Sequence, residues 1–159
     1  DTIERALNAL RRDSPQKAWY LLEGPTRPDA YIVTDDTVIV VEGKRTEAGP
    51  TVKTTWMPGR HQMLRHIDCA WESRGHRTVY GFFIVEGASD HDPSALDVPP
   101  HWIQAAKTTI SGDALASSLP HRGPDEQAEI ARCFLGVTTW QTLCATFDIP
   151  WSALPSTVS

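Results

Sequence analysis

The sequence predicts a mixed α/β domain in which helices cover a β-sheet. Three observations predict this fold class: a hairpin signal around Asp35-Asp36, a helical segment at 59–74, and a further β-rich run at 77–85. Strands and helices that follow one another in this order pack as layers around one core. With 159 residues, the chain has the length of one domain, since domains cluster near ~100–200 residues.

The first half of the chain supplies the strands of the expected sheet. They are expected at runs of β-branched and aromatic residues, which lie at 18–23, 30–34, 37–43, 51–56 and 77–85. Two helices are expected where apolar residues recur at helical spacing, at 2–12 and 59–74. Pro58 precedes the second helix and Gly75 closes it. Because 30–34 and 37–43 form a hairpin, this half is expected to be largely antiparallel.

The chain changes character after Glu86. Residues 87–100 read as a turn-rich loop, and three short helices are expected beyond it, at 101–109, 124–135 and 139–147. Pro124 suits a first helical position, and Gly136 suits a helix stop. We therefore expect a single domain over 1–159, with a core at about 1–86 and a helical C-terminal cover at about 101–150.

Charge and cysteine content exclude several classes of protein. The formal net charge is −5, yet residues 51–83 carry five basic and two acidic groups, which favours a local anion site within an acidic chain. The three cysteines form no C-x-x-C pair, which excludes a zinc ribbon or disulfide framework and favours the reducing cytoplasm. Apolar runs reach about five residues, whereas a membrane span needs ~20, so no membrane association is expected. The absence of an initial Met suggests a piece of a longer protein.

One group of charged residues around the hairpin is a candidate for a chemical role. With a turn at Asp35-Asp36, paired residues have numbers that sum to 71, so Asp29 lands opposite Glu42. Lys44 lies two residues beyond Glu42 and projects on the same face of the sheet. The sequence therefore predicts that two carboxylates and one ammonium converge at one edge of the sheet.

Two carboxylates opposite each other destabilise a hairpin, so this pair calls for compensation. Mg²⁺ compensates best, because it is usually bound by one or two carboxylates together with water. A lysine beside a metal-bound water can orient that water and offset charge on a phosphate oxygen. The backbone carbonyl of Gly43 is a candidate for a further ligand. The alternative is a solvated hairpin whose Glu42 and Lys44 are ordinary edge-strand charges.

Pro28-Asp29 followed by a hairpin and Glu42-Gly43-Lys44 resembles the motif of the PD-(D/E)xK nuclease superfamily. The resemblance covers about residues 1–86. It implies a restriction-endonuclease-like fold, which is a mixed sheet flanked by helices, here with a helical C-terminal third. It also implies a phosphodiesterase that uses Mg²⁺ or Mn²⁺ to cleave DNA. The motif places the catalytic roles on Asp29, Glu42 and Lys44, and the metal on Asp29, Glu42 and the Gly43 backbone.

The resemblance also suggests residues around this centre. Family members often add an acidic ligand from the first helix, where Glu4 lies, although helix capping is its simpler role; Glu23 is a second candidate. Some branches place a Gln on the helix after Glu-x-Lys and a Tyr a few residues on, whereas this sequence has Gln62 followed by Arg65 and His66. Contacts to nucleic-acid phosphates are expected from Gln62, Arg45, Lys53, Arg60 and Arg65. A solvated helix face is the alternative for the helical members of this set.

Two functions stay open at this point, and a third alternative is a non-nuclease α/β domain in which the motif arises by chance. The first is a Mg²⁺-dependent nuclease that acts on DNA, with RNA not excluded and a homodimer left open. The second is a module of the same fold without turnover, which binds nucleic acid or a protein partner. Mg²⁺ or Mn²⁺ binding distinguishes them, because a ligand of the native state raises its stability.

Overall fold

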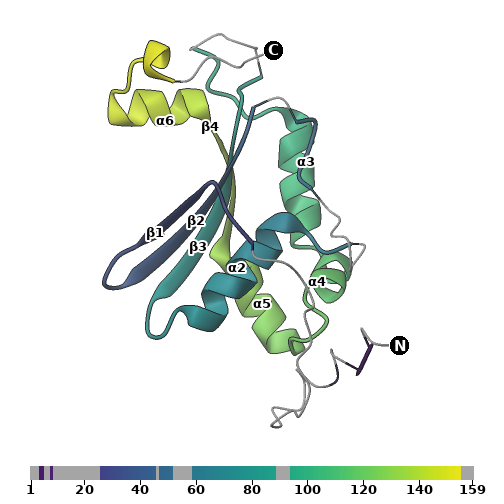
Figure 1. Cartoon of the computed structure of the whole chain (residues 1–159). Helices are drawn as coiled ribbons and strands as arrows, with labels where there is room; N and C mark the ends of the chain where they lie inside the picture. Colours follow the sequence, from purple (N-terminus) through teal and green to yellow (C-terminus); the bar gives the residue numbers. More distant parts are fainter. Residues whose placement is uncertain are drawn as a thin grey trace.

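The computed structural model describes residues 4, 5, 8, 26–45, 47–51, 59–88 and 94–154 (Figure 1). Its centre is a four-stranded mixed sheet in the order β1-β2-β3-β4. The strands are β1 (Ala30–Val33), β2 (Thr37–Lys44), β3 (Thr78–Val85) and β4 (Phe134–Thr139). The helices are α2 (Gln62–Ser73), α3 (Pro100–Thr109), α4 (Gly112–Ser118), α5 (Pro124–Cys133) and α6 (Trp140–Phe147), followed by the 3₁₀ turn η1 (Trp151–Ala153). The α/β class is thereby confirmed.

The β1–β2 hairpin has the register expected from the sequence. Ala30 pairs with Val41 and Val33 with Val38, so each pair sums to 71. The turn is held by side chains, because the Thr34 and Thr37 hydroxyls both donate to the Asp36 carboxylate, 2.8 and 3.0 Å away. These two hydrogen bonds lower the pKa of Asp36. The turn thus fixes which residues of the two strands face each other.

The rest of the sheet differs from the expectation of a largely antiparallel first half and a helical C-terminal third. β2 pairs with β3 in parallel, and β3 pairs in parallel with β4, which the sequence analysis missed. Residues 134 and 135 belong to β4 and not to the expected helix at 124–135. Gly136 has a φ of 98° next to a bulge in the β3–β4 register, so it marks an irregular strand where we expected a helix stop.

Several other expectations can be compared directly with the structure. The helices expected at 101–109 and 139–147 are confirmed as α3 and α6, whereas α4 was not expected. The strands expected at 18–23 and 51–56 lie outside the described residues, as does most of the helix expected at 2–12. No helix in the described part of the chain has the length and apolar character needed to span a bilayer.

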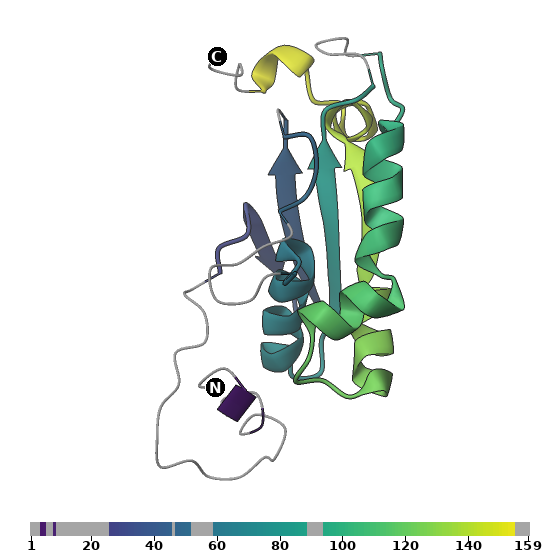
Figure 2. The ribbon, with the colours of Figure 1, turned by 90° about the vertical axis from the view of Figure 1, so that its right-hand side faces the viewer.

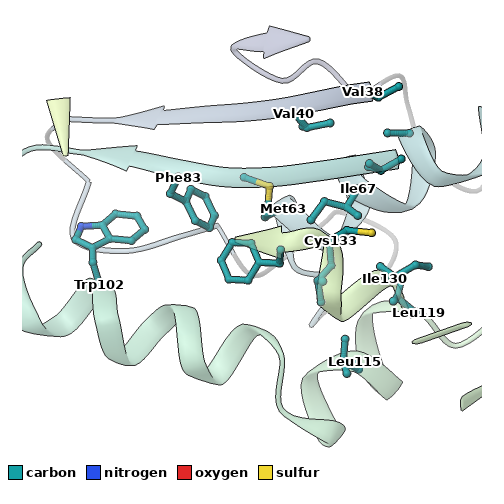
Figure 3. Close-up of a cluster of buried hydrophobic side chains, with 14 of the residues drawn as sticks. Val38, Val40, Met63, Ile67, Phe83, Trp102, Leu115, Leu119, Ile130 and Cys133 are labelled. Atoms are coloured by element: carbon teal, nitrogen blue, oxygen red, sulfur yellow. The ribbon is translucent and has the colours of Figure 1, made fainter. Parts of the chain in front are cut away.

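The core lies between the sheet and helices α2 to α5. Every second residue of β2, beginning at Val38 and Val40, faces this core together with Phe83 of β3 (Figure 3). Figure 2 shows α3, α4 and α5 along one side of the sheet. α2 approaches closely because β3 has a glycine beneath it: a Cβ on Gly81 would lie 2.6 Å from Ile67 Cγ1. This close approach brings the polar side of α2 to the end of β2.

A buried ion network fixes α2 to the segment between α4 and α5. The Asp68 carboxylate is 5% exposed and contacts Arg60, His121 and Arg122 at 3.0, 3.0 and 2.9 Å. Burial would raise the pKa of Asp68, but the hydrogen bond and charge of His121 and the two arginines outweigh it and lower the pKa to about 2. The network therefore depends on a charged Asp68.

Asp68→Asn should lower the free energy of unfolding by about 2–3 kcal/mol at neutral pH, because it leaves buried arginine charge without its counter-ion. The folded pKa of Asp68 lies below its ordinary value of 3.8, so this contribution is present above that pH and is lost as pH falls toward 2. Urea unfolding from pH 7 to about pH 2 measures both effects. Glu126→Gln, which alters an exposed partner of Arg122, serves as the control and should cost under ~0.5 kcal/mol. Equal stability of the two variants would contradict the assignment.

Candidate active site at the end of β2

The ladder between β1 and β2 ends at Pro28-Asp29 for a chemical reason. Continuing the register by two residues places Pro28 opposite Gly43, and proline has no N–H to donate to the Gly43 carbonyl. On the donor side, the Gly43 N–H donates to Oδ2 of Asp29 over 2.8 Å. Asp29 thus closes the ladder with its side chain, and its carboxylate lies beside the Gly43 backbone.

Glu42 and Lys44 lie on the same face of β2, as the sequence predicts. Glu42 is 2% exposed, and its Oε2 lies 3.4 Å from Nζ of Lys44. Nζ also lies 3.7 Å from Oε1 of Glu47, in the segment that follows the strand. A buried carboxylate and a mostly buried ammonium therefore meet where β2 leaves the core. Because a lone buried charge is very unfavourable, each of the two groups requires the other.

His66 of α2 is the member of this site that the sequence analysis did not assign. Its Nε2 lies 2.7 Å from Oε1 of Glu42, and its Nδ1 lies 2.6 Å from the Thr26 hydroxyl. Neither Nε2 of His66 nor Oε1 of Glu42 has a well-aligned hydrogen-bond partner within the described ranges. The sequence signal was the spacing of Gln62 and His66, four residues apart and hence on one helix face.

Glu86 was also missed, although it lies at the same edge of the sheet. It follows directly after β3, and parallel strands bring their carboxyl ends together. Its Oε2 lies 2.9 Å from Nε of Arg45, and the Arg45 guanidinium lies 5.8 Å from the centre of the Trp151 ring. The sequence signal for Glu86 was its position as a charged residue directly after the buried run 82–85. Arg45, expected at a phosphate, is here an ion-pair partner of Glu86.

The packing of α6 explains why residue 43 is a glycine. A Cβ at this position would lie 2.8 Å from Cζ2 of Trp140, the first residue of that helix. Even alanine would therefore collide with the indole. The contact places α6 against the face of β2 opposite Glu42. One face of the strand end therefore packs against α6, and the other carries Glu42 and Lys44.

The other expected site residues fall into four groups, the last of which is Glu4. Gln62 and Arg65 lie on α2, and Oε1 of Gln62 is buried without a hydrogen-bond partner among the residues that the structure describes. Arg60 is 3% exposed, with its guanidinium on Asp68 and the Ser118 carbonyl, so its position is that of a structural ion-pair partner. Lys53 and Glu23 lie outside the described residues.

Glu4 belongs to the few described residues near the N-terminus and is exposed. Figures 1 and 2 show this short helical stretch, in purple, at the other end of the molecule from the end of β2. In this arrangement Glu4 does not join Glu42, and the carboxylates at the site come from β2, from Asp29 before β1 and from Glu86 after β3.

The donor set can be tested against the cation that the sequence suggested. In the described part of the chain, no three His, Cys, Asp or Glu side chains come together as a metal-binding group. A Mg²⁺ site needs less than that, namely one or two carboxylates with oxygen donors and water. Oε1 of Glu42, the Asp29 carboxylate and the Gly43 carbonyl are hard oxygen donors near one strand end. Oδ2 of Asp29 lies 3.6 Å from where a Cβ of Gly43 would be, on the side that Trp140 covers, whereas we expected it on the face of Glu42. This chemistry fits Mg²⁺ or Mn²⁺ and does not fit a soft metal.

Comparison of the chain with protein-family models, curated proteins and solved structures finds no match. What the site can do is therefore argued from its own residues.

The contact between His66 and Glu42 can be measured as a coupling energy. His66→Phe keeps a ring in the core but removes Nε2, and Glu42→Gln removes the charge. Since the two side chains touch, we expect the double-mutant cycle to give a coupling of about 1 kcal/mol or more in urea unfolding. The control cycle combines His66→Phe with Glu72→Gln, an exposed residue of the same helix, and should be additive within ~0.5 kcal/mol. Additivity of both cycles would contradict the contact.

Proposed function

We propose that the chain is a Mg²⁺- or Mn²⁺-dependent phosphodiesterase that cleaves DNA at the end of β2, with a restriction-endonuclease-like fold. The observation that carries the proposal is the buried Glu42 carboxylate, which lies beside Lys44 on one face of the strand. Asp29 and the Gly43 backbone lie at the same strand end. This is the arrangement that the Pro-Asp and Glu-x-Lys resemblance implies for a nuclease.

Glu42, Asp29 and the Gly43 carbonyl would hold the cation. When bound, it supplies a Lewis acid that polarises the scissile phosphate and lowers the pKa of a bound water. Pro28 supports this role of Gly43, because it leaves that carbonyl without a ladder donor. In hydrolysis the water oxygen bonds to the phosphorus and loses a proton, while one P–O ester bond breaks and its leaving oxygen takes up a proton.

Lys44 and His66 position the reacting groups. The ammonium of Lys44 can orient the attacking water and offset negative charge on the phosphate as the new bond forms. His66 lies against the other carboxylate oxygen of Glu42 and restricts the orientation of this side chain. Gln62 starts the same helix, and we assign it, with Arg65 and Lys53, to the DNA backbone. Arg60 and Arg45 are left out of this set because each has an acidic partner.

A binding module without turnover is the second candidate. It is favoured by the lack, among the described residues, of three potential ligand side chains in one cluster, and by the pairing of Lys44 with two carboxylates. Such a module would bind nucleic acid or a protein partner without a change in stability on addition of Mg²⁺ or Mn²⁺.

The two candidates separate in a comparison of Lys44→Ala with Glu42→Gln. Lys44→Ala should leave Mn²⁺ affinity within a small factor, because lysine is no ligand, but should lower single-turnover cleavage by ~10²-fold or more. Glu42→Gln should lose Mn²⁺ binding and cleavage together. The measurements are Mn²⁺ titration, and cleavage of supercoiled, linear and single-stranded DNA with and without Mn²⁺.

Lys107→Ala is the matched control, because it removes one exposed lysine from α3, away from the end of β2. It should retain both properties, and a thermal melt of each variant shows that it folds. Cleavage by Lys44→Ala at the rate of the wild type would rule out the catalytic role of Lys44. Absence of Mn²⁺ binding and cleavage in the wild type would favour the binding module.

A further inference from the structure

The sheet has an open edge at β1, the first strand in the order β1-β2-β3-β4 (Figure 1). No other strand in the described part of the chain pairs with that edge. The Thr34 N–H donates to the Thr37 carbonyl over 2.8 Å, and from this pair inward every second residue of β1 exchanges hydrogen bonds with β2. The residues between them, Tyr31 and Val33, therefore direct their backbone N–H and C=O groups to the open edge.

Apolar side chains are exposed along this edge. Tyr31, Ile32 and Val33 are 50%, 48% and 52% exposed. Because successive side chains of a strand alternate, these three leave apolar surface on both faces of the edge. Charged residues, proline and bulges protect natural edge strands from pairing, and none of these occurs at Ala30–Val33. The edge is protected only by its length of four residues, so we expect a contact that is weak and depends on concentration.

Opposite charges lie at the two ends of this edge. Arg27 precedes β1 and Asp35 follows it, and both are exposed. The carboxylate of Asp29 is turned toward β2, where it accepts the Gly43 N–H. When two copies of β1 pair in antiparallel orientation, Arg27 of each copy meets the Asp35 end of the other, and unlike charges across strands stabilise the pair. Parallel pairing would bring Arg27 to Arg27. The edge is therefore complementary to a second, antiparallel copy of itself.

We propose that the chain forms a homodimer in which the β1 edges of two copies pair antiparallel, with Tyr31 on the twofold axis. Odd-numbered residues of this segment direct their backbone groups outward, so a hydrogen-bonded register pairs odd with odd. With Tyr31 opposite its own copy, Val33 lies opposite Asp29, and Arg27 lies opposite Asp35. A shift to Tyr31 opposite Val33 would bring the acidic residues Asp29 and Asp35 together, and a further shift toward the turn would leave Arg27 outside the contact.

This contact uses one surface twice, as twofold dimers do. It joins two four-stranded sheets into one continuous sheet and pairs the open backbone groups of both copies. The inference does not rest on the proposed nuclease function, because neither a metal nor Glu42 takes part in the contact.

The first test is sedimentation velocity of the chain over a range of protein concentrations. The wild type should change from monomer to dimer as concentration rises. Tyr31→Lys places two like charges opposite each other on the axis and should weaken the dimer by at least ~tenfold. Ile103→Lys is the control, because it adds the same charge at an apolar residue of α3 that is 45% exposed, and it should retain the dimer. A thermal melt of each variant shows that it folds.

An exchange of charges tests the antiparallel orientation. Arg27→Asp and Asp35→Lys should each weaken self-association, because each variant brings like charges together twice in its own dimer. An equimolar mixture of the two variants should restore the dimer, since every charged pair in the mixed dimer is again unlike.

Amide hydrogen exchange locates the contact. The Tyr31 and Val33 amides of the wild type should exchange more slowly as concentration rises, because the dimer supplies their hydrogen-bond partners. A chain that stays monomeric at every concentration would overturn the proposal. A dimer that Tyr31→Lys leaves unaffected, or a mixture of the two charge variants that does not associate, would overturn it as well. None of these outcomes depends on whether the chain cleaves DNA.

Discussion

The burial of the Glu42 carboxylate is the constraint on which the candidate site depends. A carboxylate that is 2% exposed needs charged or hydrogen-bonding neighbours, and this one has Lys44 on one oxygen and His66 on the other. The strand supplies the first neighbour by alternation. The helix supplies the second only because α2 lies close to the sheet, over a β3 residue that has no side chain, Gly81. The site therefore depends both on the motif, which supplies Glu42 and Lys44, and on core packing, which brings His66 to Glu42.

The backbone around Glu42 is shaped by two residues whose chemistry is equally simple. Pro28 has no N–H for the Gly43 carbonyl. The Gly43 N–H donates to the Asp29 carboxylate. Gly43 has no side chain, so the Trp140 indole can pack against it from the opposite face. The end of β2 is thus fixed from both sides, which keeps its oxygen donors in one place. Fixed donors are what a metal site requires of its protein.

The sequence predicted the parts of this structure that local chemistry determines. The β1–β2 register followed from a turn and from alternation, and it placed Glu42 and Lys44 on one face. The parallel pairing of β4 could not be found in this way, because it joins residues more than fifty positions apart, and Gly136 looked like a helix stop. His66 and Glu86 were missed for the same reason: α2 and β3 bring them to the site through tertiary packing. Arg60 looked like a phosphate contact until Asp68 was found beside it.

The most direct test of the account is a crystal structure of the chain soaked with Mn²⁺, read by anomalous scattering at the manganese edge. The account predicts a Mn²⁺ peak bounded by Glu42, Asp29 and the Gly43 carbonyl, with metal–oxygen distances of about 2.0–2.2 Å. Glu42→Gln crystals prepared in the same way should lack that peak. A Mn²⁺ ion bound elsewhere in a chain that cleaves DNA, or an end of β2 without manganese in such a chain, would contradict the central claim.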